Sequence, residues 1–574
     1  LLMSLLIGRL FYLGGIRSKH YTTLANGNRI RLRLCLPPRG RIFDRNGIIL
    51  AHDQSIYRLM FYPADCPDKR KALEEIVRIV KMPDFSMEDV LKDLKKRPKF
   101  EPYILKESLT WEEVCALEVH AISDAFQVEK GTIRAYPQKD DGAHLVGYVQ
   151  PPNEQEREDS PLSKMPDYRC GKEGVEKAFE EELQGVAGYK EIEVNARGQT
   201  IRELSKTPAI PGKEIILSLH SPLQSYILER LRGQESACAI VMDIPSGEVL
   251  SLVSAPSYDP NLFVGGFSQK TWQDISQNPY GILTNKAIRG QYPPGSIVKM
   301  IVALAALKSG KVDETTQVVC NKYCELNGHR YHCWRTHGPV TLVSALSQSC
   351  DVYFYEISKR VGIDAIENMA HTLGLGESTH IELLGEKTGL VPGREWKKKT
   401  LKRNWTAGDT ILSSIGQGAS LATPLQLCVL MANLVSGGNR VTPTLIKGYH
   451  PPSSSLEIEQ KHLDIVMKGM NSVFNDPMGT AYTHRIQKAG FEMGGKTATC
   501  QVRRISLKER STGVIKNENL PWEKRDHAMI VAYAPIVSPR FVTCVVIEHG
   551  GGGGRAAAPI AHDLLMFAQK KDLT

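Results

Sequence analysis

The distribution of apolar and polar residues divides the chain into three parts. The run Leu1–Ile16 is the most apolar stretch of the sequence. Short strands and turns are predicted in residues 17–219, interrupted at residues 67–127 by a charged segment with helical periodicity. From residue 220 to residue 574, a helix and two strands precede a helix-rich stretch and closing strands. This order predicts an α+β domain whose helices pack on an antiparallel sheet.

The N-terminal apolar run is short for a membrane-spanning helix. A bilayer crossing takes ~20 residues, and Arg17, Lys19 and His20 follow the run directly. We expect residues 1–16 to be the outer end of a single transmembrane anchor whose beginning precedes this sequence. A core or interfacial helix is the alternative, because Arg9 interrupts the run.

The composition is that of an ordinary multidomain protein. The 574 residues exceed what one hydrophobic core usually organises, and 42% hydrophobic and 24% charged residues give no sign of disorder. A net charge of +9 would allow contact with nucleic acid or an anionic membrane. However, Lys and Arg are spread along the chain without a basic stripe interleaved with aromatic residues. We therefore expect no nucleic-acid partner.

A serine at the start of an apolar helix is the first candidate for chemistry. In YPPGSIVKM, Pro293–Gly295 predicts a turn and Ser296 begins the helix, so its hydroxyl lies at the positive helix end. Lys299 follows one turn later on the same face. A desolvated lysine can take the proton of a serine hydroxyl once its pKa falls. The S-x-x-K pattern is not specific alone, since a capping serine followed by lysine is common.

Two further motifs make the combination specific. Ser349 and Asp351 form an S-x-D pair at the head of another amphipathic helix, and Lys496 and Thr497 follow two glycines. S-x-x-K, a second serine motif and K-T-G together are the known signature of penicillin-binding proteins and β-lactamases. The literal tripeptide Lys387–Gly389 lies in a turn-rich surface stretch. We assign the third motif to GGKTATCQV instead, because that stretch offers a strand edge along which a peptide substrate can add.

Longer segments in family order extend this match over nearly the whole chain. The chain resembles the class B penicillin-binding proteins, and most of all their elongation type. Segments that resemble the non-catalytic N-terminal region are RGRIFDRNGIILA, RAYPQKDDGAHLVGYV, GKEGVEKAFEEELQG and EVNARG. Segments that resemble the transpeptidase domain are GEVLSLVSAPSYDPN, YPPGSIVK, WTAGDT, IGQG with LATPLQ, HAMIVAYAP and EHGGGG.

The resemblance implies a fold for each part of the chain. Residues 220–574 would form the penicillin-recognising serine transpeptidase domain, an antiparallel sheet with helices on both faces and an inserted helical subdomain. Residues 17–219 would form an elongated, non-catalytic pedestal of the dimerisation type, with residues 67–127 as a helical head insertion. Residues 1–16 would end the membrane anchor.

The resemblance also implies catalytic roles. Ser296 would form the acyl-enzyme, Lys299 would act as its base, and Ser349 would relay a proton to or from the leaving amine. Asp351 would occupy the position where relatives often have Asn, and an Asp there is typical of the elongation type. Lys496 would complete the catalytic set.

The third motif would hold the substrate. With Lys496, the hydroxyls of Thr497 and Thr499 would bind the terminal carboxylate, and the backbone N–H groups of Ser296 and Thr499 would form the oxyanion hole. Ala498 stands where the family usually has Gly. Its methyl group fits a strand, but we expect that it could crowd the incoming substrate.

The family reaction is acyl transfer from a D-alanyl-D-alanine stem peptide of peptidoglycan to a neighbouring amine. By resemblance, the chain would be acylated and inhibited by β-lactams, and D,D-carboxypeptidase activity is conceivable as a side reaction. The pedestal would contact a polytopic glycan polymerase of the elongation machinery and rod-shape scaffold proteins. The chain would be a single-pass protein of the cytoplasmic (inner) membrane, with its catalytic domain on the periplasmic side.

A group of cysteines near the second serine motif suggests a metal. Cys320, Cys324, Cys333 and His337 are spaced as C-x3-C-x8-C-x3-H, and Cys350 lies inside the S-x-D motif. Four soft ligands suit tetrahedral Zn²⁺. Elongation-type relatives can carry a metal beside the active site, and the resemblance favours Cys320, Cys333, His337 and Cys350 as ligands of a structural zinc. A disulfide or free thiols are the alternatives.

Two other functions remain as alternatives. A receptor or scaffold could keep the fold without chemistry, although it would have no need of the activated Ser296. A β-lactamase shares the motifs and would be distinguished by rapid deacylation, but it would need neither the long N-terminal region nor an anchor.

Overall fold

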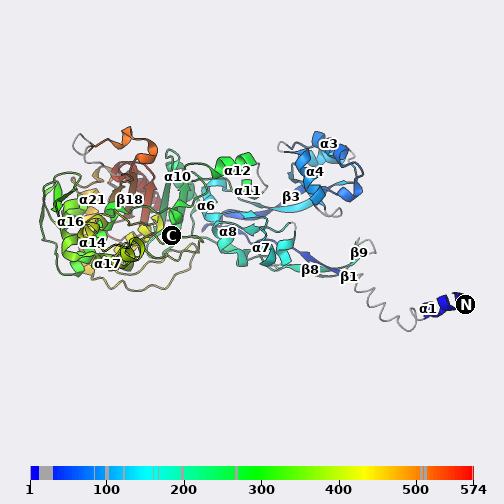
Figure 1. The fold of residues 1–574 in the computed structure, drawn as a ribbon, viewed down its shortest axis with the longest axis horizontal. Coiled ribbons are helices and arrows are strands. Elements are labelled where there is room, and N and C mark those ends of the chain that lie inside the picture. Colours follow the sequence, from blue (N-terminus) through cyan, green and yellow to red (C-terminus); the bar gives the residue numbers. More distant parts are fainter. Residues whose placement is uncertain are drawn as a thin grey trace.

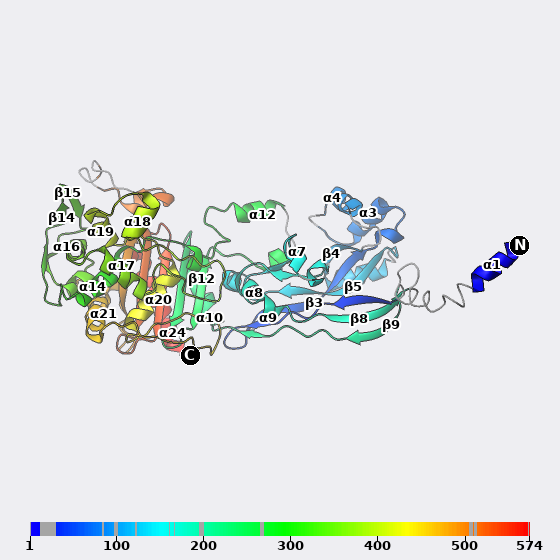
Figure 2. The same cartoon turned by 60° about the horizontal axis from the view of Figure 1, so that its bottom comes forward.

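The computed structural model describes most of the chain, namely residues 2–11, 30–82, 85–96, 102–120, 123–159, 161–165, 167–194, 200–264, 269–503, 509, 514–571 and 573. The molecule is long, with a globular C-terminal part at one end and the N-terminal helix α1 (Leu2–Phe11) at the other (Figures 1 and 2). Within the described ranges, none of the helices combines the length and the apolar character that a bilayer crossing requires. Residues 1 and 12–16 of the expected anchor lie outside these ranges.

The C-terminal part is built on a five-stranded sheet in the order β12-β11-β19-β18-β17, with every neighbouring pair antiparallel. The predicted antiparallel sheet is thus present, and its edge strand β17 carries the third motif. The strands are β11 (Ala237–Asp243), β12 (Val249–Ala255), β17 (Gly494–Cys500), β18 (His527–Ala534) and β19 (Phe541–Ile547).

Both faces of this sheet are buried, which explains why its strands are apolar throughout. On β11, Ala237, Ala239 and Val241 enter one core, whereas Cys238 and Ile240 enter the other. Helices α10 (Ser221–Leu231) and α24 (Ala558–Lys571) cover the first face, and α20 (Pro424–Val435) covers the second. Because neither face meets water, the polar alternation of a half-exposed strand is absent from these strands.

The inserted helical region lies on the α20 side of the sheet. Its apolar helix α14 is surrounded by core residues, and α16 and α17 pack against it. The main helices are α14 (Val298–Lys308), α15 (Leu342–Ser347), α16 (Asp351–Val361), α17 (Ile363–Thr372), α18 (Arg394–Leu401), α19 (Ala407–Ser413) and α21 (Gln460–Asn475). Two small antiparallel pairs, absent from the sequence prediction, interrupt this region: β13 (Val318–Cys320) with β16 (Gly338–Val340), and β14 (Tyr323–Leu326) with β15 (His329–His332).

The N-terminal part is made of two larger sheets, the short antiparallel pair β6 (Val149–Gln150) with β7 (Cys170–Gly171), and a helical head. Strand β3 is 13 residues long and runs from the C-terminal part to the head (Figure 2). The sheets consist of β2 (Ile42–Phe43), β3 (Ile49–Phe61), β4 (Tyr103–Leu109), β5 (Phe126–Ala135) and β10 (Ile215–Ile216), and of β1 (Ile30–Cys35), β8 (Gly188–Val194) and β9 (Thr200–Thr207).

The head is formed by the segment with helical periodicity. Helices α3 (Lys69–Ile79), α4 (Met87–Lys96) and α5 (Trp111–Val119) bury their apolar faces against β3 and its neighbours in a separate core. Residues 67–127 are not wholly helical, because they also contain β4, which pairs with β3. The burial of residues along β4 does not alternate, so this strand lacks the period of two by which a strand is recognised in a sequence.

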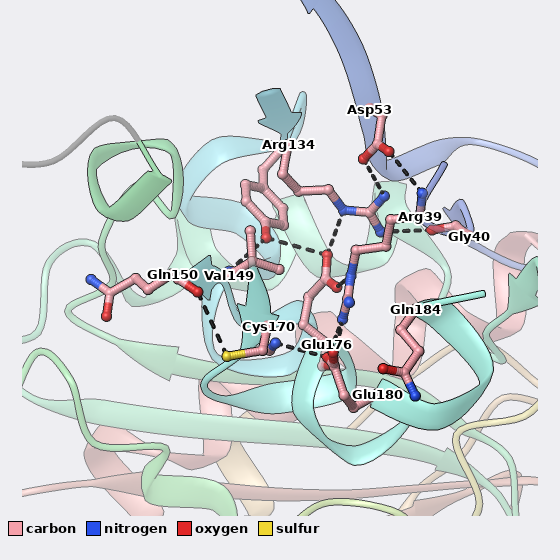
Figure 3. A network of polar contacts seen from close by, with 12 residues as sticks. Arg39, Gly40, Asp53, Arg134, Val149, Gln150, Cys170, Glu176, Glu180 and Gln184 are labelled. Atoms are coloured by element: carbon pink, nitrogen blue, oxygen red, sulfur yellow. Dashed lines mark hydrogen bonds and ion pairs between the residues drawn. The ribbon is translucent and has the colours of Figure 1, made fainter. Parts of the chain in front are cut away.

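A buried polar network holds the base of the N-terminal part together (Figure 3). The carboxylate of Glu176 accepts hydrogen bonds from Arg39 Nε and from Arg134 Nε, each at 2.7 Å. Arg39 also donates to Glu180 at 2.7 Å, and Arg134 donates to Asp53 at 3.1 Å. Residues more than a hundred positions apart are therefore joined by fully paired charges.

The two parts of the molecule share packing where they meet. The backbone N–H of Tyr136 donates to Asn261 Oδ1 at 2.9 Å, and Asn261 Nδ2 returns a bond to the Tyr136 carbonyl at 3.0 Å. Tyr148 stacks on Phe263 with ring centroids 4.1 Å apart. One continuous apolar core includes residues of both parts, so the N-terminal part packs directly against the C-terminal part.

Candidate active site

The turn that carries Ser296 is locked against strand β17. Residues Gly295–Ile297 form one 3-10 turn before α14 begins. Gly295 has a φ of 55°, and its N–H donates to the Gly416 carbonyl at 3.1 Å. A Cβ at Gly295 would lie 2.9 Å from Cys500 Sγ and 3.3 Å from Ala498 Cβ. Only glycine fits this backbone conformation and the narrow space between the turn and β17. Strand β17 and the turn Gly295–Ile297, called the nucleophile turn below, are therefore in close contact.

Ser349 lies at the centre of the side chains of the three motifs. Its hydroxyl donates to Ser296 Oγ at 3.0 Å and accepts hydrogen bonds from Lys299 Nζ at 3.1 Å and Lys496 Nζ at 3.0 Å. Lys299 also donates to the Ser349 carbonyl at 2.9 Å and to Asp351 Oδ1 at 2.7 Å. The three sequence motifs thus converge, and this hydrogen-bond chain connects Lys299 to Ser296 through Ser349.

The two lysines are fully buried, and they share one carboxylate, that of Asp351. Burial lowers the pKa of Lys496 well below its ordinary value, and the nearby Lys299 cation lowers it further, against the pull of Asp351. Burial also raises the pKa of Asp351, against the pull of Lys299. The site therefore disfavours the protonated form of Lys496.

Strand β17 presents its third-motif residues in different directions. Thr499 is exposed and accepts a bond from the Gly553 N–H at 3.3 Å, whereas Thr497 Oγ1 lies 2.8 Å from Thr480 Oγ1. The Ala498 side chain is 2% exposed and faces the nucleophile turn. Its methyl group therefore packs between β17 and the turn at Gly295.

The literal K-T-G tripeptide lies elsewhere. Lys387 and Thr388 are exposed, and the Lys387 N–H donates to the Ile288 carbonyl at 2.9 Å. None of the contacts found among the described residues ties Lys387 to the catalytic side chains.

The four predicted metal ligands lie together behind the second motif. One ligand atom from each of Cys320, Cys333, His337 and Cys350 lies within 4.8 Å of the others. Both Cys320 Sγ and Cys333 Sγ are 3.5 Å from His337 Nδ1. Cys324 is outside this group, since its thiol contacts Glu356 Oε1 at 3.0 Å.

Hydrogen bonds with Cys350 and His337 lower the pKa of the Cys333 thiol. The pKa of the Cys350 thiol is raised, because Cys350 contacts Cys333 and is buried. No disulfide joins any of the twelve cysteines, all of which lie within the described ranges.

Some residues of the site had no signal in the sequence. Thr480 bonds to Thr497 from a loop 17 positions earlier, and Trp334 Nε1 donates to the Ser349 carbonyl at 3.3 Å. Ser349 itself has a φ of 55°, a left-handed conformation that is costly for serine. Contacts of this kind depend on how distant loops meet, which residue spacing does not specify.

Comparison with known protein families covers both parts of the chain. Residues 237–566 match the penicillin-binding protein transpeptidase domain, and residues 35–217 match the penicillin-binding protein dimerisation domain.

Individual relatives match over nearly the full length. The peptidoglycan D,D-transpeptidase MrdA of Haemophilus influenzae is 34% identical, over 99% of this chain and 89% of that protein. Penicillin-binding protein PBP2 of Helicobacter pylori, solved in complex with MreC, superposes with a TM-score of 0.84 at 28% identity, covering 95% of this chain and 100% of that one. A chain from a structure on the coordination of polymerization and crosslinking by a peptidoglycan synthase complex superposes with a TM-score of 0.73 at 28% identity. The superposition covers 99% of this chain and 96% of that one.

The sheet, the helical insertion and the converging serine and lysine motifs are those of the penicillin-recognising serine acyltransferases. The full-length matches narrow this class further. The chain belongs to the class B penicillin-binding proteins of the elongation type, the penicillin-binding protein 2 family. It is a serine D,D-transpeptidase of peptidoglycan and a target of β-lactams.

Proposed function

We propose that Ser296 is the nucleophile through which this transpeptidase forms its acyl-enzyme. The observation that supports this most directly is the hydrogen-bond chain from Lys299 through Ser349 to Ser296. Ser296 Oγ attacks the carbonyl carbon between the two terminal D-alanines, the C–N bond breaks, and the departing amine takes up a proton. Lys299 is the base that receives the serine proton, and Ser349 passes a proton to the leaving amine.

Substrate binding falls to the edge of β17. The stem peptide adds along this edge, and its terminal carboxylate is held by Lys496, Thr497 and Thr499. The N–H groups of Ser296 and Thr499 face the developing oxyanion. The contact between the nucleophile turn and β17 sets the spacing of these two donors.

The intact mass of the protein after incubation with benzylpenicillin tests this proposal. We expect a stable adduct on the parent chain and none on Ser296→Ala. Ser309→Ala, an exposed serine at the other end of α14, is the matched control and should be acylated like the parent. An adduct on Ser296→Ala would refute the assignment. Absence of any adduct on the parent would favour the scaffold function, and rapid loss of the adduct would favour a β-lactamase.

We also propose where the enzyme works. Residues 1–16 end a single transmembrane anchor, residues 17–219 form the pedestal, and residues 220–574 catalyse the reaction on the periplasmic side of the inner membrane. The pedestal contacts rod-shape scaffold proteins and a polytopic glycan polymerase. Support comes from the Helicobacter pylori relative, which was solved with MreC, and from the relative in a peptidoglycan synthase complex.

A structural zinc ion is the last part of the proposal. The donor set fits the ion, because three thiols and one imidazole lie within 4.8 Å of one another and the three sulfurs are buried. Asp351 N–H points to Cys333 Sγ at 3.2 Å, as expected for a site that stabilises a thiolate. When bound, zinc would supply a rigid cross-link beneath the Ser349 turn and no Lewis-acid chemistry.

Metal analysis of the purified protein tests the zinc site. We expect about one equivalent of zinc in the parent and in Cys324→Ser, and a loss of zinc with a lower Tm in Cys333→Ser. Equal zinc contents in Cys333→Ser and the parent would refute this ligand set.

A further inference from the structure

A groove lies beside the catalytic centre, between helices α15 and α21. Its volume is about 570 Å³. One wall consists of Ser344, Ser347 and Gln348, at the end of α15 and just before Ser349. The opposite wall is formed by Lys468 and Ser472 of α21, together with Met478 of the loop that follows.

The groove is connected to the place where the substrate carboxylate would be held. The Thr480 N–H donates to the Ser347 carbonyl in the groove wall at 3.2 Å. The Thr480 hydroxyl lies 2.8 Å from that of Thr497 on β17. Thr480 therefore joins the groove wall to the carboxylate-binding end of the strand.

Reaction chemistry decides which substrate can enter from this end. The leaving D-alanine carries the carboxylate, so its amine departs on the side of Thr497. In the second half-reaction, an acceptor amine attacks the same carbonyl carbon, and by microscopic reversibility it arrives where the first amine departed. We propose that the groove between α15 and α21 binds the acceptor stem peptide of this transpeptidase.

The lining of the groove suits a peptide with a positively charged amine. It is mostly hydroxyl and amide groups, with Val343 and Met478 as its apolar members. Its ionisable residues are Glu314, Lys468 and Asp476, which leaves one excess negative charge. Glu314 and Lys468 pair at 2.5 Å across exposed side chains, so both are open to a ligand. The carboxylates attract an ammonium group, whereas Lys468 can meet a carboxylate on the same ligand.

The transfer step balances without a further reactant. The acceptor amine, after losing a proton to solvent, attacks the acyl carbon, and its new C–N bond replaces the C–O bond to Ser296. Of the two protons left on the amine, one passes to Ser296 Oγ through Ser349 and the other stays on the new amide nitrogen. The groove positions the amine and takes no part in forming the acyl-enzyme. This inference rests on the proposed function, but it concerns only the second half-reaction.

The experiment separates the two half-reactions in the full chain. Acylation is followed with a fluorescent penicillin. Transfer is followed by mass spectrometry, with a thioester analogue of the donor stem and two acceptor tripeptides, one ending in meso-diaminopimelate and one in L-lysine. Val343→Trp fills the groove, and Val537→Trp places the same side chain on an exposed loop as a control. Asp476→Asn removes one groove charge, and Asp464→Asn removes an exposed charge of α21 outside the groove.

We expect Val343→Trp to lower the ratio of transfer to hydrolysis at least ~10-fold with the better acceptor, because misplacing one reactant forfeits much of the advantage of proximity. Asp476→Asn should raise the acceptor KM ~3-fold or more with kcat little changed. Acylation should stay at the parent rate in both, and the controls should match the parent. Parent-like transfer in both groove variants would overturn the inference. Loss of acylation in the parent would instead refute the proposed function.

Discussion

The pedestal and the catalytic domain each bury a cluster of charged side chains, but the charges are balanced differently. In the pedestal, Arg39 and Arg134 meet the carboxylates of Asp53, Glu176 and Glu180. Burial alone would raise the pKa of Glu176, yet the two guanidinium groups outweigh it and hold that pKa below its ordinary value. Every charge in this cluster has a partner.

In the catalytic domain the cations outnumber the carboxylates, whereas in the pedestal cluster three carboxylates meet two guanidinium groups. Lys299 and Lys496 are both fully buried, and Asp351 is the carboxylate they share. A buried cation without its own counterion is costly, and the cost appears as a lowered affinity for its proton. The comparison teaches that complete pairing serves the fold, whereas incomplete pairing prepares a group for proton transfer.

Removing a charge from the pedestal should have the largest effect. Glu176→Gln leaves two buried arginines without their shared carboxylate, and we expect a loss of about 3–5 kcal/mol in the free energy of unfolding. Equilibrium unfolding in urea measures this change in the free energy of unfolding. Glu214→Gln removes one partner of the exposed pair with Arg41 and should cost about 1 kcal/mol or less. If Glu176→Gln were as stable as Glu214→Gln, the pedestal cluster would not be structural.

Removing a charge from the catalytic cluster should affect the rate. Lys496→Met takes away a donor to Ser349 and the amine that we propose holds the substrate carboxylate. We expect the rate of acylation by penicillin to fall by about 10²–10³-fold, the usual cost of a lost transition-state donor. Lys387→Met, in the exposed literal tripeptide, should be acylated at the parent rate. Equal losses in the two variants would show that the third motif is misassigned.

The same Lys496→Met variant should be slightly more stable than the parent. The substitution removes the cost of burying the Lys496 amine, and we expect the free energy of unfolding to rise by about 1 kcal/mol at neutral pH. Because the folded pKa of Lys496 lies below its ordinary value of 10.5, the unfolded parent binds the extra proton. The stability that the parent loses by burying Lys496 therefore becomes smaller as pH rises toward 10.5. The stability advantage of Lys496→Met over the parent should become smaller with it. Urea unfolding at pH 7 and pH 9.5 measures this, and a gain that grew with pH would contradict it.

The sequence was most informative where function depends on local spacing. Ser296 and Lys299 are three positions apart, although Ser296 lies in the 3-10 turn before α14 and not in the helix that the sequence predicted it to begin. The strand with Lys496 was recognisable from its glycines and its apolar continuation. The C-terminal strands were predicted because each is a short apolar run next to a turn. Cys333 and His337 are four positions apart in one loop, so the sequence alone indicated that they lie close together.

Contacts between residues that are far apart in the chain could not be predicted from local spacing. Arg39 and Glu176 are 137 positions apart, and neither has a neighbour in the sequence that indicates burial. The direction of the Ala498 methyl group was also not predictable, since it depends on which face of β17 meets Gly295. In both cases the deciding contact forms only when distant segments pack together.

The position of β17 at the edge of its sheet also bears on self-association. Among the described strands, β17 pairs with β18 alone, so its other edge has no strand neighbour. Most proteins shield such an edge, because a strand from another copy can dock there and start aggregation. An enzyme that takes its substrate as an added strand has to leave this edge open. We therefore expect bound penicillin to make concentrated protein more resistant to aggregation, independently of any gain in folding stability.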